Sequence, residues 1–138
     1  MNKLSVAIIT KNEERNIGRC LKSVQWADEI VVVDSGSSDK TIDICQKFNC
    51  KIVETEWLGF GKTKQLAVNN CSHDWVLSID ADEELTTELQ NRIKTILQNP
   101  DADGYYIKRM SFYLNKLIHH CGWNHDFPLR LFNRRNGS

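Results

Sequence analysis

The sequence predicts an α/β fold, a three-layer α/β/α sandwich whose central sheet is mostly parallel and has the strand order 3-2-1-4. Three observations lead to this prediction. Apolar runs alternate with segments in which apolar residues have helical spacing. The runs are apolar at successive positions, which is typical of parallel strands that are buried on both faces. Right-handed crossovers with short links then favour a doubly wound order of strands.

The first half of the chain supplies three strands and two helices. The predicted strands, each a continuous apolar run, cover 4–10, 29–34 and 51–54. Asn12 is predicted to cap the first helix, which extends to about Val24. Ser38 or Asp39 is predicted to cap the second helix, because both residue types are favoured at that position.

The second half begins with a glycine-bearing loop that leads into a helix over about 62–71. Thr86 or Thr87 is predicted to open another helix, which Pro100 stops. Further strands are predicted at 75–80, 104–110 and 128–133. We therefore expect one domain, since 138 residues suffice for a single core.

Charge is distributed unevenly along the chain. The formal net charge is zero, which argues against a nucleic-acid-binding protein. Residues 1–104 nevertheless hold 12 basic against 17 acidic residues, whereas residues 105–138 hold six basic residues and Asp126 alone among acids. This segregation indicates either a basic end that meets an anionic acceptor or a membrane surface, or chance.

The cysteines and the N-terminal residues bear on the compartment. The five cysteines form no CxxC pair, and an odd number without such spacing predicts free thiols in a reducing cytosol: Cys20, Cys45, Cys50, Cys71 and Cys121. The first apolar run is too short for a signal peptide or a membrane span. We expect a cytoplasmic protein.

Two aspartates follow the fourth predicted strand. Asp80 and Asp82 are separated by one residue, so in an extended segment their carboxylates point the same way. Two close carboxylates repel each other unless a cation lies between them, and Mg²⁺ or Mn²⁺ accepts such oxygen ligands together with substrate phosphates. The alternative is a solvated turn in which Asp82, Glu83 or Glu84 caps the following helix.

Polar residues also follow strands one and two. In the doubly wound order the carboxyl ends of strands one and four flank the expected ligand cleft, and strand one ends in Thr10-Lys11-Asn12-Glu13. Asp34 ends strand two and can accept hydrogen bonds from a base or ribose. The simpler alternative is that Asp34 caps the turn that follows it.

A basic, glycine-bearing loop precedes the third helix. In WLGFGKTKQ (57–65), Lys62 and Lys64 are predicted to reach over a diphosphate as point charges. The spacing is not that of a Walker A loop. The alternative is that both lysines are solvated.

The last part of the chain holds a candidate base. Asp126 lies among apolar and aromatic residues, which favour a raised carboxyl pKa and therefore a general base. The alternative is that Asp126 pairs with Arg130 or another nearby arginine. A zinc site is disfavoured because the spacing of the nearby histidines and cysteine matches no standard pattern: His119, His120, Cys121 and His125.

Taken together, these motifs resemble glycosyltransferases of family 2, which have the GT-A fold. The chain is most similar to the branch that adds glucose to the inner core of lipopolysaccharide. The matching segments are SVAIITKNEERNIGRCLKSV (5–24), EIVVVDSGSSDKT (29–41), EWLGFGKTKQLA (56–67), WVLSIDADEEL (75–85) and GWNHDFPLRLFNRR (122–135). The resemblance implies a metal-dependent, inverting transfer of a sugar, glucose from UDP-glucose in particular, to a hydroxyl of a glycan or lipopolysaccharide-core acceptor.

The resemblance also implies a nucleoside pocket. Thr10, Asn12 and Glu13 would line it, and Asp34 would lie beside the base or ribose. Many relatives carry a second acid after the strand-two aspartate, where this chain has Ser35, and this departure weakens the assignment of base recognition.

The remaining implied roles concern the diphosphate and the chemistry. Lys62 or Lys64 would approach the nucleotide, Asp80 would contact ribose or metal, and Asp82 would bind the Mg²⁺ or Mn²⁺ ion directly. Asp126 falls where the family often places its catalytic base.

The resemblance sets expectations for the whole protein. Relatives are usually longer, so residues 1–138 are expected to form a single nucleotide-sugar-binding domain that lacks the acceptor-binding part. Expected partners are the nucleotide-sugar donor and an anionic glycan or lipid-linked acceptor, with peripheral contact at the cytoplasmic face of the inner membrane and no nucleic acid. The alternative functions are a non-catalytic nucleotide-binding module and a metal-dependent nucleotidyltransferase.

Overall fold

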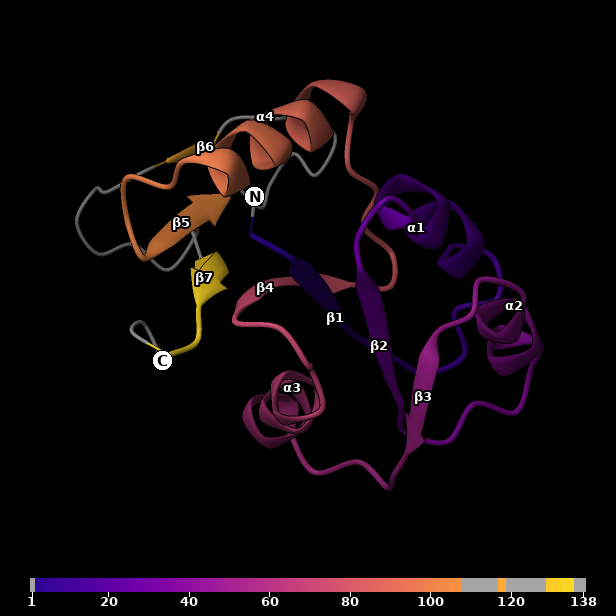
Figure 1. Ribbon diagram of the computed structural model, residues 1–138. Helices are drawn as coiled ribbons and strands as arrows, with labels where there is room; N and C mark the ends of the chain where they lie inside the picture. Colours follow the sequence, from indigo (N-terminus) through magenta and orange to yellow (C-terminus); the bar gives the residue numbers. More distant parts are fainter. Residues whose placement is uncertain (1, 108–116, 119–128, 136–138) are drawn as a thin grey trace.

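The computed structural model describes residues 2–107, 117–118 and 129–135. Strands and helices alternate along most of this part of the chain (Figure 1). The elements in order are β1 (Leu4–Thr10), α1 (Ile17–Val24), β2 (Glu29–Asp34), α2 (Thr41–Lys47), β3 (Lys51–Glu54), α3 (Phe60–Asn69), β4 (Trp75–Asp80), α4 (Thr87–Gln98), β5 (Gly104–Ile107), β6 (Leu117–Ile118) and β7 (Leu129–Asn133).

The strands form one mixed sheet in the order β3-β2-β1-β4-β7-β5-β6. The pairs among β1 to β4 are parallel, and β7 joins β4 as an antiparallel strand. The predicted order 3-2-1-4 is confirmed. Thr10 pairs with Asp34, and Ile9 pairs with Asp80, so β1, β2 and β4 end at the same edge of the sheet.

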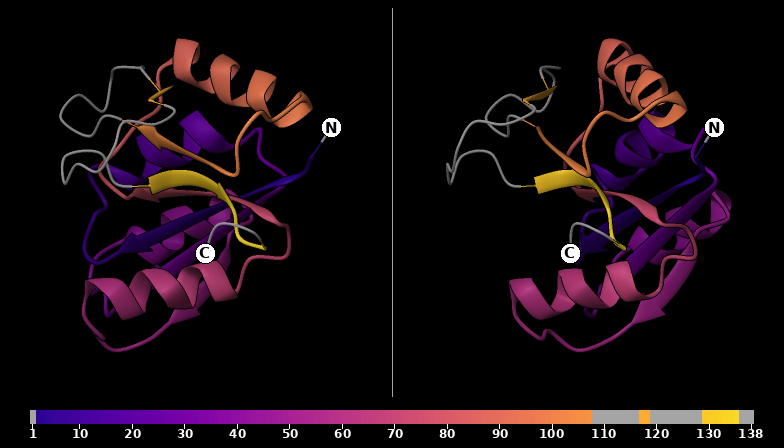
Figure 2. Two further views of the ribbon diagram at one scale, coloured as in Figure 1. Left: turned by 90° about the vertical axis from the view of Figure 1, so that its left-hand side faces the viewer. Right: turned by 60° about the vertical axis from the view of Figure 1, so that its left-hand side comes forward.

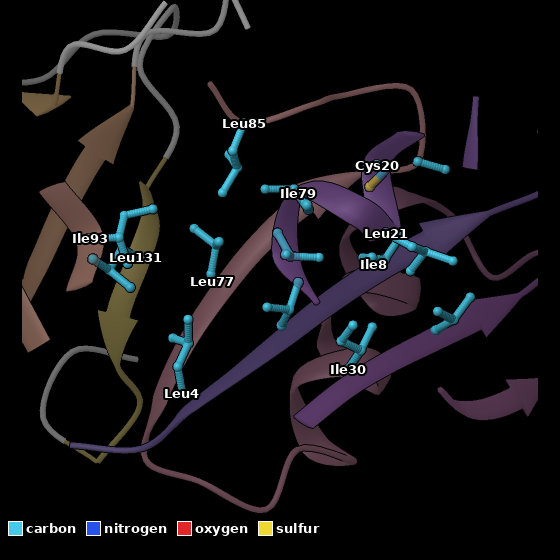
Figure 3. Packing of buried hydrophobic residues seen from close by; sticks show 14 of the residues in the cluster. Leu4, Ile8, Cys20, Leu21, Ile30, Leu77, Ile79, Leu85, Ile93 and Leu131 are labelled. Atoms are coloured by element: carbon cyan, nitrogen blue, oxygen red, sulfur yellow. The ribbon is translucent and has the colours of Figure 1, made fainter. Parts of the chain in front are cut away.

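Helices cover both faces of this sheet, as in the predicted three-layer sandwich. α3 lies on one face, and α1, α2 and α4 lie on the other (Figure 2). Side chains of β1 show why both faces are buried: Ile8 packs in the cluster with α1 and α4, and Ala7 packs with Ala67 of α3. Figure 3 shows Ile8, Leu21 and Ile79 in the larger cluster.

Two predicted helix starts are wrong and one is confirmed. α1 begins at Ile17, because Asn12 adopts φ +53° and its side-chain oxygen accepts a hydrogen bond from the Ser38 N–H at 2.7 Å. In α2, neither Ser38 nor Asp39 occupies the capping position, which Lys40 holds. Thr86 caps α4 by accepting a hydrogen bond from the Leu89 N–H, as predicted.

Among the described residues, no helix has both the length and the apolar character that crossing a bilayer requires. Of the cysteines in this part of the chain, Cys20, Cys45 and Cys71 are buried free thiols, and Cys50 is a partly exposed one. The prediction of free thiols therefore agrees with the described part of the structure.

Candidate functional site

A cleft of about 570 Å³ lies at the edge where β1, β2 and β4 end. Its walls come from four segments that are far apart in the sequence: the ends of β1, β2 and β4 with the residues that follow them, and the connection between β3 and α3. The lining residues are Ile9, Thr10, Lys11, Glu13, Ser35, Trp57, Phe60, Asp80, Ala81 and Asp82. Four of the predicted site residues thus meet in one cavity.

Thr10 offers the cleft an unused hydrogen-bonding group. The residue ends β1 and is 6% exposed. Its Oγ1 has no hydrogen-bond partner within the described part of the chain. A buried hydroxyl without a partner is costly, so a polar ligand in the cleft would stabilise this arrangement.

Asp80 and Asp82 line the cleft from the end of β4, the strand next to β1. Asp80 is the last residue of β4, and its Oδ1 lies 3.7 Å from the Lys64 Nζ of α3. Asp82 is exposed at the tip of the turn. The turn is closed from both sides: the Asp80 N–H donates to Glu83 Oε1 at 2.7 Å, and the Glu83 N–H donates to the Asp80 carbonyl at 3.0 Å.

The two carboxylates suit an ion such as Mg²⁺ or Mn²⁺ that takes its remaining ligands from water and phosphate, rather than an ion enclosed by protein ligands. No group of three or more metal-ligating side chains occurs within residues 2–107, 117–118 and 129–135. Mg²⁺ typically takes one or two carboxylates and completes its shell with water and phosphate. The Lys64 ammonium lies beside Asp80 and already compensates part of the negative charge of the turn.

A buried ion pair supports this turn, and sequence reasoning missed it. Arg130 of β7 donates from Nη1 to Glu83 Oε1 at 2.6 Å and from Nη2 to Glu83 Oε2 at 2.9 Å. Arg130 is 2% exposed and Glu83 is 8% exposed. The signal was a lone arginine between two leucines of an apolar strand, because a buried arginine nearly always requires an anionic partner.

Asp34 is buried and holds its own turn. Its carboxylate accepts hydrogen bonds from the N–H groups of Gly36 and Ser37 at 3.0 and 2.8 Å, and from the Ser37 hydroxyl. Asp34 does not line the cleft described above, although its neighbour Ser35 does. The structure thus agrees with the alternative interpretation, in which Asp34 organises the turn.

Asn12 and Glu13 connect the loop after β1 to the loop after β2 and to the first residue of α2. The Asn12 N–H donates to the Ser37 hydroxyl at 2.8 Å, and the Glu13 N–H donates to Thr41 Oγ1 at 2.9 Å. Glu13 lines the cleft, whereas Asn12 does not. The predicted group at the end of β1 is therefore only partly directed at the cavity.

The loop between β3 and α3 contributes aromatic rings as well as lysines. Trp57 and Phe60 line the cleft, are 53% and 60% exposed, and lie edge to face with ring centroids 5.4 Å apart. Gly59 between them has φ +93°, a conformation that favours glycine. Lys64 lies over the Phe60 ring, whereas Lys62 is exposed and does not line the cleft.

One thiol lies directly behind the turn. Cys20 of α1 is buried, and its Sγ donates to the Asp80 carbonyl at 3.7 Å. Burial raises the pKa of this thiol, and the acidic residues nearby raise it further. Cys20 is therefore a neutral packing residue rather than a nucleophile.

The predicted base and the predicted histidine-rich segment lie outside the described residues. They comprise His119, His120, Cys121, His125 and Asp126. Arg130, one of the alternative partners considered for Asp126, pairs with Glu83 in the described part of the structure.

Comparison with known proteins identifies a family and several relatives of this chain. The family model described as "Glycosyl transferase family 2" matches residues 5–137. An uncharacterised glycosyltransferase of Rickettsia typhi is 44% identical over 96% of this chain and 43% of its own length. The lipopolysaccharide core biosynthesis glycosyltransferase LpsC of Rhizobium meliloti is 37% identical over 71% of this chain and 38% of its own length.

Solved structures share the fold. The crystal structure of S. aureus TarS 1–349 with UDP-GlcNAc has a TM-score of 0.64 and 29% identity over 74% of this chain and 33% of that one. The mannosyltransferase PcManGT of Pyrobaculum calidifontis, with GDP-Man and Mn²⁺, has a TM-score of 0.64 and 25% identity over 81% of this chain and 37% of that one. The chain thus spans less than half the length of these relatives.

Proposed function

The chain belongs to glycosyl transferase family 2, and we propose that it is a metal-dependent, inverting glycosyltransferase that moves glucose from UDP-glucose to a hydroxyl of a glycan acceptor. The observation that carries the proposal is the shared cleft: Thr10 at the end of β1 lines the same cavity as Asp80 and Asp82 at the end of β4. Hydrogen-bonding and anionic walls at one opening suit a ligand that has both a nucleoside and a metal-associated diphosphate.

The nucleoside is assigned to the wall made by β1 and the β3–α3 loop. The unpartnered Thr10 hydroxyl is available to a ribose or base, and Glu13 lines the cleft beside it. Trp57 and Phe60 offer an apolar surface to the flat face of the base. Asn12 supports this wall by linking the two loops, and Asp34 supports it by holding its own turn.

The diphosphate is assigned to the wall made by β4 and α3. Asp82, with Asp80, would hold Mg²⁺ or Mn²⁺, and the bound cation would neutralise charge on the departing diphosphate. Lys64, which pairs with Asp80, is within reach of the same phosphate oxygens. Lys62 is exposed and does not line the cleft, so it is assigned a weaker, long-range role.

The remaining assignments concern the acceptor and the general base. Asp126 is proposed to take the proton of the acceptor hydroxyl. Similarity to LpsC supports a lipopolysaccharide-core acceptor. The basic charge near the C-terminus supports it less than expected, because Arg130 is paired with Glu83, and Arg134 and Arg135 also make contacts within the protein.

Asp82→Asn tests the proposal most directly. We expect UDP-glucose binding that depends on Mn²⁺ to weaken about tenfold or more in calorimetry, which is about 1.4 kcal/mol, with the melting temperature unchanged because Asp82 is exposed. Asp43→Asn, an exposed aspartate on α2, is the control. Unchanged Mn²⁺-dependent binding in Asp82→Asn would contradict the metal assignment.

Turnover separates an enzyme from a non-catalytic nucleotide-binding module. We expect release of UDP from UDP-glucose to accelerate when an acceptor glycan is added. A thermal-shift panel of nucleotide sugars, each with Mn²⁺ or with EDTA, identifies the donor first. Tight binding without turnover on any acceptor would favour the module.

A further inference from the structure

The Glu83–Arg130 pair lies where the hydrogen bonding between β4 and β7 ends. The ladder of these strands runs from Trp75–Asn133 to Leu77–Leu131. Beyond it, Arg130 Nη1 donates to the Ser78 carbonyl at 3.1 Å, so a side chain continues the connection that the backbone no longer makes. The same guanidinium then holds both oxygens of Glu83.

Glu83 also bonds to the turn that carries Asp80 and Asp82, here called the aspartate turn. Its Oε1 accepts the Asp80 N–H at 2.7 Å while it also accepts Arg130 Nη1 at 2.6 Å. The Asp80 backbone is therefore fixed through a carboxylate whose orientation is set by β7. Ala81 is buried beneath the turn, which leaves Asp82 as the residue presented at its tip.

Stability alone is a poor explanation for this pair. Removing a carboxylate and a guanidinium from water is expensive, and a well-packed apolar pair of similar size often stabilises a protein equally or better. What an apolar pair cannot provide is an acceptor for the Asp80 N–H. A buried ionic pair at this place therefore points to control of the turn's geometry.

We propose that Glu83 is a positioning residue for the donor site, and that Arg130 locks it in the orientation that holds Asp80 and Asp82 toward the cleft. This inference rests on the proposed function. Groups that orient metal-binding side chains typically change metal affinity by about 10- to 100-fold when they are removed. Loss of the Glu83 acceptor is expected to act in the same range.

Two matched double variants separate positioning from packing. Glu83→Met with Arg130→Met removes the ion pair and the acceptor for the Asp80 N–H. Glu83→Gln with Arg130→Met also removes the ion pair, but the amide oxygen retains the acceptor. We expect both to melt near the wild-type temperature, and the first to bind UDP in the presence of Mn²⁺ about tenfold more weakly than the second.

Amide hydrogen exchange without any ligand provides a second measurement. The peptide that contains Asp80 should exchange faster in the Met/Met variant than in the Gln/Met variant. Equal exchange and equal UDP affinity in the two variants would overturn the inference. If the wild-type protein binds no nucleotide, the proposed function fails, while the exchange comparison still decides whether Glu83 holds the turn.

A third variant covers the case in which the double variants do not fold. Glu83→Asp keeps the charge beside Arg130 but is one methylene shorter, so its carboxylate cannot reach both Arg130 and the Asp80 N–H. We expect a folded protein with faster exchange at Asp80 and about tenfold weaker Mn²⁺-dependent UDP binding. Wild-type exchange and affinity in Glu83→Asp would count against the inference.

Discussion

Trp57 and Phe60 expose large aromatic surfaces to water at the mouth of a polar cleft. Their edge-to-face contact and the Lys64 ammonium over the Phe60 ring hold them at that place. Bases stack on aromatic side chains with little regard to their identity, and such stacking contributes about 1–3 kcal/mol per base. The pair therefore suits the planar end of a nucleotide.

Trp57→Ala is expected to weaken UDP binding about 5- to 150-fold, which corresponds to the loss of about 1–3 kcal/mol of stacking. Calorimetry with UDP and with free glucose measures it, and only the UDP affinity should change. Leu58→Ala is the matched control, because Leu58 is partly exposed on the same loop but does not line the cleft. Equal UDP affinities for the two variants would contradict the stacking role.

Individual residues were predictable only where the sheet places them. The position of Thr10, Asp80 and Asp82 at the cleft could be predicted from the sequence, because parallel strands bring their carboxyl ends to one edge. The role of Asp34 stayed open between base recognition and turn formation, since both use the same carboxylate. Trp57 and the partnership of Glu83 with Arg130 depend on which loops meet in space, and no local pattern encodes this.

The geometry of α3 determines which of its two N-terminal lysines contacts Asp80. Lys62 and Lys64 both lie in the first turns of α3, but residues two apart on a helix point in very different directions, about 200° apart. Lys64 thus pairs with Asp80, while Lys62 faces solvent. A lysine beside a carboxylate that binds metal competes with the metal when no diphosphate is present.

Lys64→Met is expected to change two affinities in opposite directions. Mn²⁺ alone should bind more tightly, because the ammonium no longer neutralises Asp80, whereas UDP should bind more weakly in the presence of Mn²⁺. Titration followed by the paramagnetic resonance of free Mn²⁺ measures the first, and calorimetry measures the second. Lys62→Met should change neither by more than about twofold. A Lys64→Met protein with weaker Mn²⁺ binding would contradict the competition.

The start of α4 provides a test of local stability. Thr86 accepts the Leu89 N–H at 3.1 Å, whereas Thr87 is the first helical residue and is exposed. Thr86→Ala should lower the free energy of unfolding by about 1 kcal/mol, and Thr87→Ala should change it by less than about 0.5 kcal/mol. Urea unfolding measures both. Equal losses would show that the hydroxyl of Thr86 is not the cap.

Strand boundaries were more predictable than helix boundaries. The four parallel strands begin and end where predicted, because burial on both faces leaves a continuous apolar run with polar residues at its ends. α1 begins at Ile17 because Asn12 and Glu13 bind the loop after β2 instead of starting a helix. The preference of asparagine for a cap was outweighed by contacts with residues about 25 positions away.

A second polar cluster connects β1, β2 and the residues just before β4 at the opposite edge of the sheet. Glu29 at the start of β2 accepts the Ser5 hydroxyl of β1 at 2.6 Å, and it accepts the N–H and hydroxyl of Ser72, just before β4, at 2.7 and 2.9 Å. Partial burial acts to raise the pKa of Glu29, but these hydrogen bonds outweigh it, and the pKa is lowered. The cluster therefore stabilises the protein in the ionised form.

Glu29→Gln should reduce the dependence of stability on pH in acid. Because the folded-state pKa is lowered, the unfolded chain binds more protons, and the contribution of Glu29 is complete above its unfolded pKa and lost as pH falls through the folded one. Urea unfolding from pH 7 down to about pH 3 measures this. Glu54→Gln, at the exposed end of β3, is the control. The same acid-induced loss in Glu29→Gln and wild type would contradict the role.

The pairing of Arg130 with a carboxylate 47 residues earlier has a consequence for biosynthesis. A ribosome adds about 5–20 residues per second, so Arg130 is synthesised roughly 2–9 s after Glu83. Until then the aspartate turn has no guanidinium to orient it, although all the parallel strands have already been synthesised. This edge of the sheet is therefore completed only after β7 has been made.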